Sequence, residues 1–399
     1  MTPAPARIGR GSRAYAQARW ALFAAVFATF ALLYCIQPLL PVFSADFAIS
    51  PAESSLAVSL TTVMLAISMP VAGALSESFG RKTPMAVSLF CAAGLCLVTA
   101  IAPTWHEILV ARVFEGLALA SVPTIAIAYL SEEIEPRDLG TAIGHYIGGT
   151  AIGGMLGRVL MGVMTDATGS WRIALGIMAM SGFAATAVFL RTLPPSRHFP
   201  GARGIDIPRL LGAFARHVSD PIIRALCLEG FLVMGGFVTI FNYIGYRLAA
   251  APYHLSQSEI GAVFVVYAAG IPASPWFGGL SHRIGNGRAV SGAALVMLAG
   301  IALTLFHPLA AIVAGLTLLS TGFFGGHSVL SGWVGARADG AKAQASSLYL
   351  LGYYLGSSTL GSCGGWVWQA LGWNGIVGFV ALLFAVTLTI AWRLRGVGV

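Results

Sequence analysis

Long apolar stretches separated by short polar breaks run through the whole chain. An α-helix needs about 20 mostly apolar residues to cross a bilayer, and the stretches have that length. The pattern predicts twelve membrane-spanning helices, at about 20–43, 55–75, 84–102, 106–130, 139–165, 171–192, 223–247, 257–280, 288–306, 309–334, 343–370 and 373–394.

Composition supports a chain that folds in lipid. Apolar residues make up 57% of it and charged residues 10%, against roughly a quarter charged in soluble domains. The five cysteines all fall in apolar stretches without paired spacing, which favours packing over disulfides or metal ligands. Phosphate-loop, HExxH and GxSxG patterns are absent from the sequence. We therefore expect an all-α integral membrane protein that is not an enzyme and holds no metal or cofactor.

The two halves of the sequence repeat each other. GALSESFGRK and GGLSHRIGNGR start 205 positions apart, as do Gln37 and Asn242, and Trp171 precedes Trp373 by 202. We expect two pseudo-symmetric six-helix bundles, an N-terminal one at 1–192 and a C-terminal one at 222–399. The segment 193–221 is predicted to be a cytoplasmic linker, in which Pro208 opens a short amphipathic helix. Parallel repeats of this kind are typical of transporters.

Basic residues predict the orientation, because cytoplasmic loops carry an excess of Lys and Arg. With the N-terminus inside, 19 of the 23 basic residues fall on the inner side. Arg172 and Arg247 fall outside, and Arg112 and Arg158 lie within spans. The net charge of +8 therefore reflects topology, and we expect no nucleic-acid partner. Both termini are predicted to be cytoplasmic.

These features together resemble the major facilitator superfamily. The family's loop pattern is G-x-L-x-D-R-x-G-R-K, in which this chain has Glu77 for the aspartate and Ser78 for the arginine. The run YCIQPLLPVFSADF and the run YIGGTAIGGMLGR resemble the bacterial drug:proton antiporter and sugar-efflux branch. The branch's proline in span 5 is replaced, since Thr150 follows the glycine pair. The resemblance covers essentially the whole chain.

The resemblance implies a gating role for the loop after span 2. In the family the acidic residue of this loop faces the N-terminus of span 11, where unpaired N–H groups carry partial positive charge. We expect this contact to latch the halves on the inner side. The alternative is that the basic residues of the loop only set topology. The predicted gating residues are Gly73, Glu77, Gly80, Arg81 and Lys82.

Ionisable residues inside spans are costly and therefore candidates for function. Arg112 and Glu115 lie three apart on one helix face, and Arg158 lies in the next span. This group is read either as a proton relay or as a static ion-pair network. Glu229 in span 7 is either a second buried carboxylate or a residue that reaches the cytoplasmic surface. His327 is expected to be a hydrogen-bonded packing residue.

Glycines spaced four residues apart in spans 5 and 11 build flat faces for close packing. The repeat suggests that both ladders serve the interface between the halves, with general packing as the alternative. Substrate is expected near mid-membrane, between the bundles. Buried amide side chains need hydrogen-bond partners, so Gln37 and Asn242, which occupy matching repeat positions, are the strongest candidates for substrate binding. The predicted substrate-binding residues are Gln37, Tyr34, Asn242, Phe241, Tyr243, Tyr246 and Tyr353.

The sequence thus predicts a proton-coupled exporter of a small organic solute in a bacterial inner membrane. The coupling ion would be a proton, and the partners would be the substrate and the lipid bilayer, with the protein a monomer. One alternative is a proton-coupled importer of a sugar or organic acid. Another is a membrane-embedded receptor or enzyme.

Overall fold

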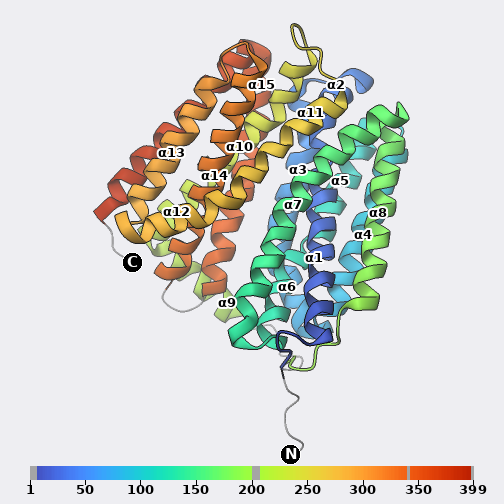
Figure 1. Ribbon diagram of the computed structural model, residues 1–399, viewed down its shortest axis with the longest axis vertical. Coiled ribbons are helices and arrows are strands. Elements are labelled where there is room, and N and C mark those ends of the chain that lie inside the picture. Colours follow the sequence, from blue (N-terminus) through green and yellow to red (C-terminus); the bar gives the residue numbers. More distant parts are fainter. Residues whose placement is uncertain (1–6, 200–206, 339–341, 397–399) are drawn as a thin grey trace, which may run out of the picture. The chain divides into compact units, whose positions relative to one another are not determined.

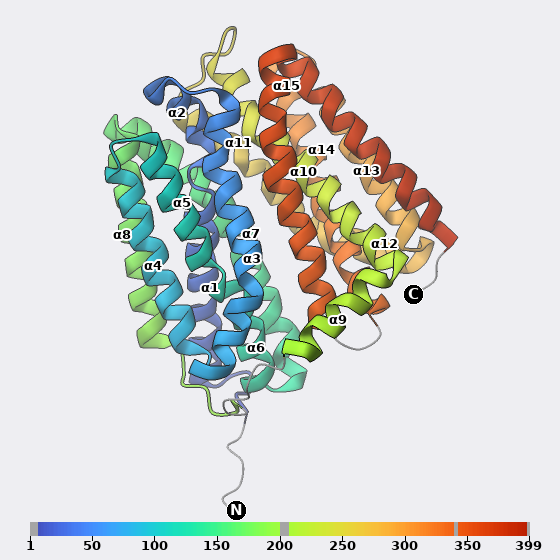
Figure 2. The ribbon, with the colours of Figure 1, turned by 180° about the vertical axis from the view of Figure 1, so that it is seen from behind.

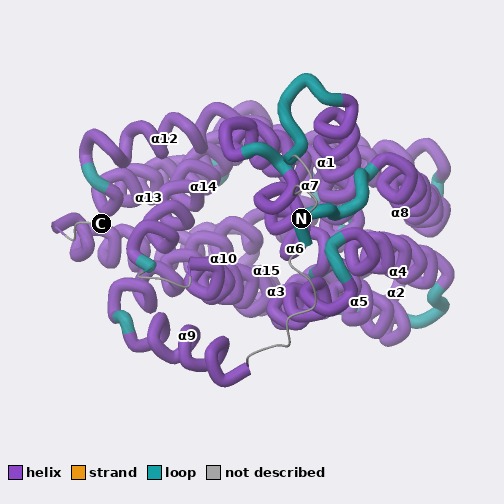
Figure 3. The backbone as a smooth tube through the Cα atoms, turned by 90° about the horizontal axis from the view of Figure 1, so that it is seen from below, coloured by secondary structure: helices purple, strands orange, loops and turns teal. Residues whose placement is uncertain are grey.

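The computed structural model describes residues 7–199, 207–338 and 342–396. Over these residues the backbone is helical almost throughout, and short loops join the helices (Figure 3). By backbone packing the chain divides into two units. Unit 1 comprises Met1–Ile36 and Met64–Ile205, and unit 2 comprises Gln37–Val63 and Asp206–Val399.

Unit 1 is a bundle in which α1 packs against α7 and α8, and α4 packs against α5 and α8 (Figure 1). The later part of α3 belongs to this unit. Its helices are α1 (Arg13–Tyr34), α3 (Pro51–Phe79), α4 (Lys82–Ile101), α5 (Trp105–Leu119), α6 (Ser121–Glu133), α7 (Pro136–Thr168) and α8 (Trp171–Thr192).

Unit 2 is built around the close packing of α10 on α15 (Figure 2). The first residues of α3, up to Val63, also belong to it. Its other elements are η1 (Gln37–Leu39), α2 (Leu40–Phe47), α9 (Ile207–Ser219), α10 (Pro221–Ala249), α11 (Gln257–Val263), η2 (Phe264–Ala269), α12 (Gly270–Ile284), α13 (Asn286–Leu303), α14 (Leu309–Arg337), α15 (Lys342–Arg393) and η3 (Leu394–Gly396).

The prediction of twelve spans is confirmed. Eleven segments of the described chain are long and apolar enough to cross a membrane, and the last of them runs from Gln344 to Gly396. That segment contains two spans, because α15 is interrupted at Gly372, whose φ of 60° and ψ of −152° are not helical. A helix of 52 residues would otherwise be about 78 Å long, more than twice the thickness of a bilayer core. Helix α9 confirms the short helix predicted at Pro208.

The internal repeat is visible in the backbone as well as in the residues. Gly80 has φ of 79° and Gly285 has φ of 90°, and each ends its copy of the loop motif. Gly169 and Gly372 take positive φ before the repeat-related tryptophans Trp171 and Trp373. Residues with a Cβ rarely adopt these values, so glycine is required at the tight turns between spans.

The ladder of Gly149, Gly153 and Gly157, and its counterpart at Gly352 and Gly356, pack inside their own units, which supports the alternative of general packing for these residues; a Cβ on Gly144 or Gly148 would meet no other residue within 4 Å. A Cβ on Gly157 of α7 would lie 2.6 Å from Ala31 Cα of α1, and Gly153 faces the Phe27 backbone equally closely. In unit 2 a Cβ on Gly352 of α15 would lie 2.9 Å from the Cys227 carbonyl oxygen of α10. The missing side chains let α7 approach α1, and α15 approach α10, at backbone distance.

Candidate functional site

The centre of unit 1 holds a fully buried ion pair. Arg112 and Glu115 lie one turn apart on α5, and both side chains have 0% exposure. Arg112 Nη1 donates to Glu115 Oε2 at 2.6 Å. The other carboxylate oxygen, Oε1, has no hydrogen-bond partner among the described residues. The pair thus offers one free acceptor position on a buried carboxylate.

Arg112 also binds the end of the first helix. Its guanidinium donates to the carbonyl oxygens of Leu32 at 3.4 Å and Leu33 at 2.8 Å. Helix α1 ends at Tyr34, so these carbonyls belong to the last turn, which lacks intrahelical donors. A cation at this position satisfies them and complements the helix dipole. Arg112 therefore joins Glu115 to the end of α1.

Arg158 of α7 lies beside this group. Its guanidinium sits over the ring of Tyr34, 4.3 Å from the ring centre, and Nη1 donates to the Gly154 carbonyl at 2.5 Å. A guanidinium over an aromatic face is a stabilising cation–π arrangement. Tyr34, predicted to bind substrate, is buried and covered by Arg158 in this conformation. The ion pair with Glu115 is made by Arg112.

In unit 2 the two repeat-related amides bind each other. Gln37 Nε2 donates to Asn242 Oδ1 at 2.7 Å, and both side chains are buried. Asn242 Nδ2 has no hydrogen-bond partner among the described residues and faces Gly361. Buried amides need partners, and these two supply part of that need to one another. The sequence identified the pair, and the structure adds that the two side chains are in direct contact.

The predicted tyrosines of α10 are also engaged. The Tyr246 hydroxyl lies 2.6 Å from the hydroxyls of both Ser44 and Ser54, and donates to the Leu40 carbonyl at 2.8 Å. Tyr243 donates to the Gly361 carbonyl at 2.9 Å. Within unit 2, the bonds of Tyr246 tie residues 40–54 to α10, and the bond of Tyr243 ties α10 to α15.

A cluster of aromatic rings fills the neighbouring part of unit 2. Phe241 is buried and packs on Tyr267, with ring centres 4.7 Å apart. Tyr353 is only partly buried and lies 4.7 Å from the ring of His327. His327 Nδ1 is 2.9 Å from the Tyr349 hydroxyl, so this histidine is hydrogen-bonded within the cluster.

Glu229 is buried, which corrects the alternative that it reaches the cytoplasmic surface. Its side chain has 0% exposure because α15 covers this face of α10. The Thr387 hydroxyl and the Ala391 backbone lie close to it, but neither carboxylate oxygen has a partner in hydrogen-bonding geometry. The Tyr349 ring rests against the next residue, Gly230.

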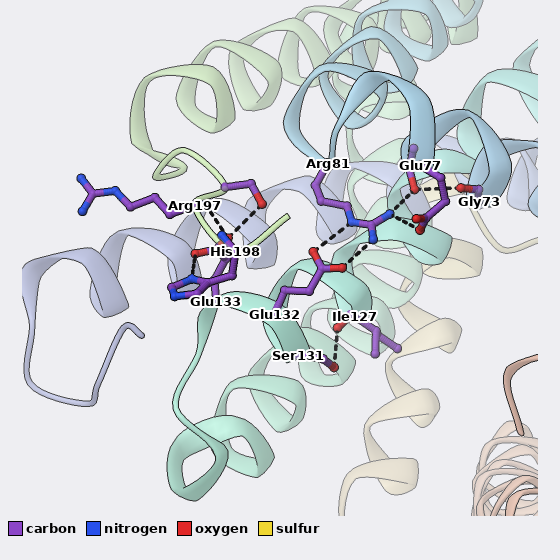
Figure 4. A network of polar contacts seen from close by, with 11 residues as sticks. Gly73, Glu77, Arg81, Ile127, Ser131, Glu132, Glu133, Arg197 and His198 are labelled. Atoms are coloured by element: carbon purple, nitrogen blue, oxygen red, sulfur yellow. Dashed lines mark hydrogen bonds and ion pairs between the residues drawn. The ribbon is translucent and has the colours of Figure 1, made fainter. Parts of the chain in front are cut away.

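Two of the predicted gating residues, Glu77 and Arg81, form a polar network at the α3–α4 turn (Figure 4). Arg81 binds Glu77 at 2.8 Å and both oxygens of Glu132 at 2.5 and 3.0 Å. Burial opposes the charge, but the bonds to the two carboxylates outweigh it and raise the pKa of Arg81 above its usual value. Lys82 Nζ donates to the Leu193 carbonyl at 2.7 Å. Within unit 1 these basic side chains are therefore structural partners as well as charges.

Sequence reasoning missed the two acidic residues at the end of α6. Glu132 binds Arg81, and Glu133 accepts from Ser196, from the backbone N–H groups of Arg197 and His198, and from the His198 ring (Figure 4). The backbone of Glu133 also accepts from Ile8 N–H at 2.7 Å. The signal was the acidic run SEEIE at the end of a span where basic residues dominate.

A second set that was missed consists of small hydroxyl residues. The Thr62 hydroxyl is 2.8 Å from that of Ser358, which also donates to the Ser59 carbonyl at 2.8 Å. Ser362 donates to the Ser59 hydroxyl at 2.8 Å. These residues of α3 and α15 lie within unit 2. The regular three- and four-residue spacing of Ser55, Ser59 and Thr62 was the available signal.

Comparison with known proteins identifies relatives along nearly the whole chain. Residues 22–251 match the model of the Major Facilitator Superfamily. The chain is 45% identical over 388 residues to the inner membrane transport protein YnfM of Escherichia coli (strain K12), covering 97% of this chain and 93% of the relative. It is 42% identical over 381 residues to the uncharacterized MFS-type transporter YybF of Bacillus subtilis (strain 168), covering 96% and 94%.

Solved structures share the fold at low identity. A bacterial homolog of the human lysosomal transporter Spinster, in an inward-facing and unoccupied conformation, is similar with a TM-score of 0.73 at 16% identity, covering 95% of each chain. The human organic anion transporter MFSD10 (TETRAN) is similar with a TM-score of 0.69 at 17% identity, covering 94% of this chain and 99% of the other. These likenesses confirm the predicted fold of twelve helices in two six-helix bundles.

Proposed function

Because the chain belongs to the major facilitator superfamily, and is thus a multi-pass membrane transporter, not an enzyme, we propose that it is a proton-coupled exporter of a small organic solute. The observation that carries the proposal is the buried Arg112–Glu115 pair with its free carboxylate oxygen. The coupling ion is the proton, and no cofactor takes part.

The location of this pair supports coupling over a purely static role. Protonation of Glu115 would cancel the attraction that holds Arg112 in place. Arg112 would then be free to leave the last carbonyls of α1, which would lose their cap. The chain continues from Tyr34 to Gln37, whose amide binds Asn242. One proton on α5 therefore acts on the segment that ends span 1.

The contacts of residues 37–63 suggest what such a change would release. The bonds of Gln37, Ser54 and Thr62 to α10 and α15 hold these residues to unit 2. With the orientation given by the basic residues, these bonds lie toward the outer side, and both termini are cytoplasmic. We take their opening and closing as part of alternating access.

The remaining assignments rest on relatives and on chemistry. A relative named as an inner membrane transport protein supports placement in a bacterial inner membrane. Glu77 and Arg81 are assigned to the latch, together with Gly73, Gly80 and Lys82. We assign the substrate to the aromatic and amide residues of unit 2, and we take the protein to be a monomer. Import of a sugar or organic acid is the second candidate, because a proton-coupling residue alone does not set direction.

Transport by the Glu115→Gln variant tests the proposal. The first step is a thermal-stabilisation screen of the purified protein against small organic solutes. The stabilising solute is then assayed in proteoliposomes with and without an imposed pH gradient. Glutamine keeps the shape of the side chain but cannot bind or release a proton. We expect gradient-driven accumulation to be lost while solute binding and exchange remain.

The matched control is Glu107→Gln, which removes an exposed carboxylate from the first turn of the same helix. It should transport like the parent protein. Accumulation by the Glu115→Gln protein with a normal dependence on the pH gradient would contradict proton coupling at this site and leave the ion pair as a structural element.

A further inference from the structure

Glu229 is a buried carboxyl group that the mechanism above does not use. Both of its oxygens and the nearby Thr387 hydroxyl lack hydrogen-bond partners among the described residues. Among these residues no ion pair includes Glu229. An ionised carboxylate buried without a partner is far too costly to persist, so the group must be neutralised. The question is which cation neutralises it.

A proton fits the surroundings better than a metal ion does. Hard cations such as Ca²⁺ take six to eight oxygen ligands, and Mg²⁺ requires a near-octahedral set. The side chains near Glu229 offer one carboxylate and one hydroxyl. A proton needs only one carboxylate oxygen, and the Thr387 hydroxyl is then available as a hydrogen-bond partner after a small movement.

A chain of polar side chains leads from this group toward the surface of unit 2. The Tyr349 ring rests on Gly230, beside Glu229, and the phenol lies within electrostatic reach of the carboxyl. The Tyr349 hydroxyl is 2.9 Å from His327 Nδ1. His327 and the neighbouring Tyr353 are partly exposed, whereas Tyr349 and Glu229 are buried. The two ring nitrogens of an imidazole can accept a proton on one side and donate one on the other, which suits His327 to a relay.

We propose that Glu229 is a second proton-binding site, and that His327 and Tyr349 form its path to the partly exposed aromatic face of unit 2. An imidazolium at His327 gives its proton to the phenol oxygen, and the phenol's own proton passes to the carboxylate. The products are a neutral imidazole and a neutral carboxylic acid. The last transfer requires the carboxyl and the phenol to approach, since the two are not hydrogen-bonded in this structure.

Among the described residues, no charged group on the surrounding helices forms an ion pair with Glu229. Cys227 lies on the same helix, and its thiol interacts with Tyr349. Helices α9, α14 and α15 also pack on α10, and besides His217 and His327 they carry Arg216, Arg337, Lys342 and Arg393, while α10 itself carries Arg224 and Arg247. At the 205-residue offset of the repeat, Glu229 corresponds to Ala24 in the first half. This carboxyl therefore has no equivalent at the matching position of the first half, in which Glu115 is a buried carboxyl on another helix.

Infrared spectroscopy of the purified full-length protein in lipid tests this inference. The inference rests on the proposed proton coupling. The infrared measurement needs neither substrate nor a pH gradient, so its outcome is independent of the transport test. A protonated carboxyl group has a carbonyl stretch that an ionised one lacks. We expect the Glu229→Gln protein to lose one such band at neutral pH. An unchanged set of bands would overturn the assignment.

The path is tested by the rate at which that band shifts after transfer to heavy water. Tyr349→Phe removes the hydroxyl and should slow the exchange about tenfold, which corresponds to about 1.4 kcal/mol in the barrier. His327→Asn should slow it as well. Tyr354→Phe, a buried tyrosine on the same helix, is the matched control and should exchange at the parent rate. Equal rates in the Tyr349→Phe and parent proteins would rule out the path.

Discussion

Replacing Arg112 with methionine should destabilise the protein by about 3–5 kcal/mol, the usual cost of removing one partner from a buried pair. The pair is fully buried with its charged atoms 2.6 Å apart. At an effective dielectric constant of about 20 the attraction at that distance is about 6 kcal/mol, part of which offsets the cost of burying both charges. Methionine fills a similar volume, so the loss is mainly that of the ion pair and of the bonds to Leu32 and Leu33.

Glu115→Gln should cost less, about 1–3 kcal/mol. The glutamine carbonyl can still accept from Arg112, and the guanidinium keeps the two carbonyls at the end of α1. The double variant Arg112→Met with Glu115→Leu should recover most of the loss, because it leaves no buried charge unpaired. The ranking of the three variants by unfolding free energy separates the effect of a lost charge from that of lost packing.

The two single variants should also respond differently to pH. In Arg112→Met the carboxyl of Glu115 is buried alone, and it can escape the penalty by binding a proton. The folded state then binds more protons than the unfolded state, so the stability of this variant falls as pH rises. In Glu115→Gln the remaining guanidinium cannot lose its proton and the glutamine does not titrate, so this site should add no pH dependence to the stability of the variant.

Unfolding of the purified proteins in mixed micelles, followed by tryptophan fluorescence between pH 5 and pH 8, measures these free energies. Equal stability of Arg112→Met and the parent over the whole range would refute the reasoning. So would a pH response of the same size in both single variants, because only one of them retains a group that can titrate.

Three further predictions follow from packing, turns and charge. Gly157→Leu should lower the yield of folded protein measured by gel filtration, because its Cβ would lie 2.6 Å from Ala31 Cα and overpacking costs about 1–3 kcal/mol. Gly148→Leu, at an open position of the same helix, should leave the yield unchanged. Gly80→Ala should cost about 1–2 kcal/mol in unfolding free energy because of its φ of 79°, whereas Gly140→Ala at an open helical position should cost nothing measurable. Partial burial raises the pKa of Asp220, but the Ile222 N–H and the Arg337 guanidinium outweigh it and hold this pKa below its usual value, so the native state binds fewer protons than the unfolded state. The resulting stabilisation is present at neutral pH and is lost as pH falls through the lowered pKa. The unfolding free energy of Asp220→Asn, measured from pH 7 to pH 3, should therefore depend less on acid than that of the parent protein.

The helices themselves were predictable because one physical requirement defines them. A span must be apolar over about 20 residues, and the polar breaks mark its ends. The break between the last two spans was found at residues 371–372, where Gly372 interrupts α15. Helix α9 was likewise predictable from Pro208 and the alternation that follows it.

The partners of polar residues were harder to predict, because they depend on which faces meet. Gln37 and Asn242 were singled out by the repeat, but nothing in their spacing says that they bind each other. The position of Glu229 along its helix did not reveal that α15 covers it. Glu133 was not singled out at all, although four donors from residues 196–198 converge on it. The domain boundaries at 192 and 222 remain a prediction.

The positive-φ glycines that close the two loop motifs have a consequence for ancestry. Gly80 and Gly285 both have a positive φ, whereas the acidic position of the motif is glutamate in the first copy, at Glu77, and histidine in the second, at His282. A positive φ in a tight turn selects for glycine, because residues with a Cβ rarely adopt it. A charged position, in contrast, is selected by the partner that each copy has acquired. The evidence of the gene duplication is therefore preserved best at glycines whose backbone conformation requires them. Ancient duplications of this kind should be traced through such glycines before their reactive residues.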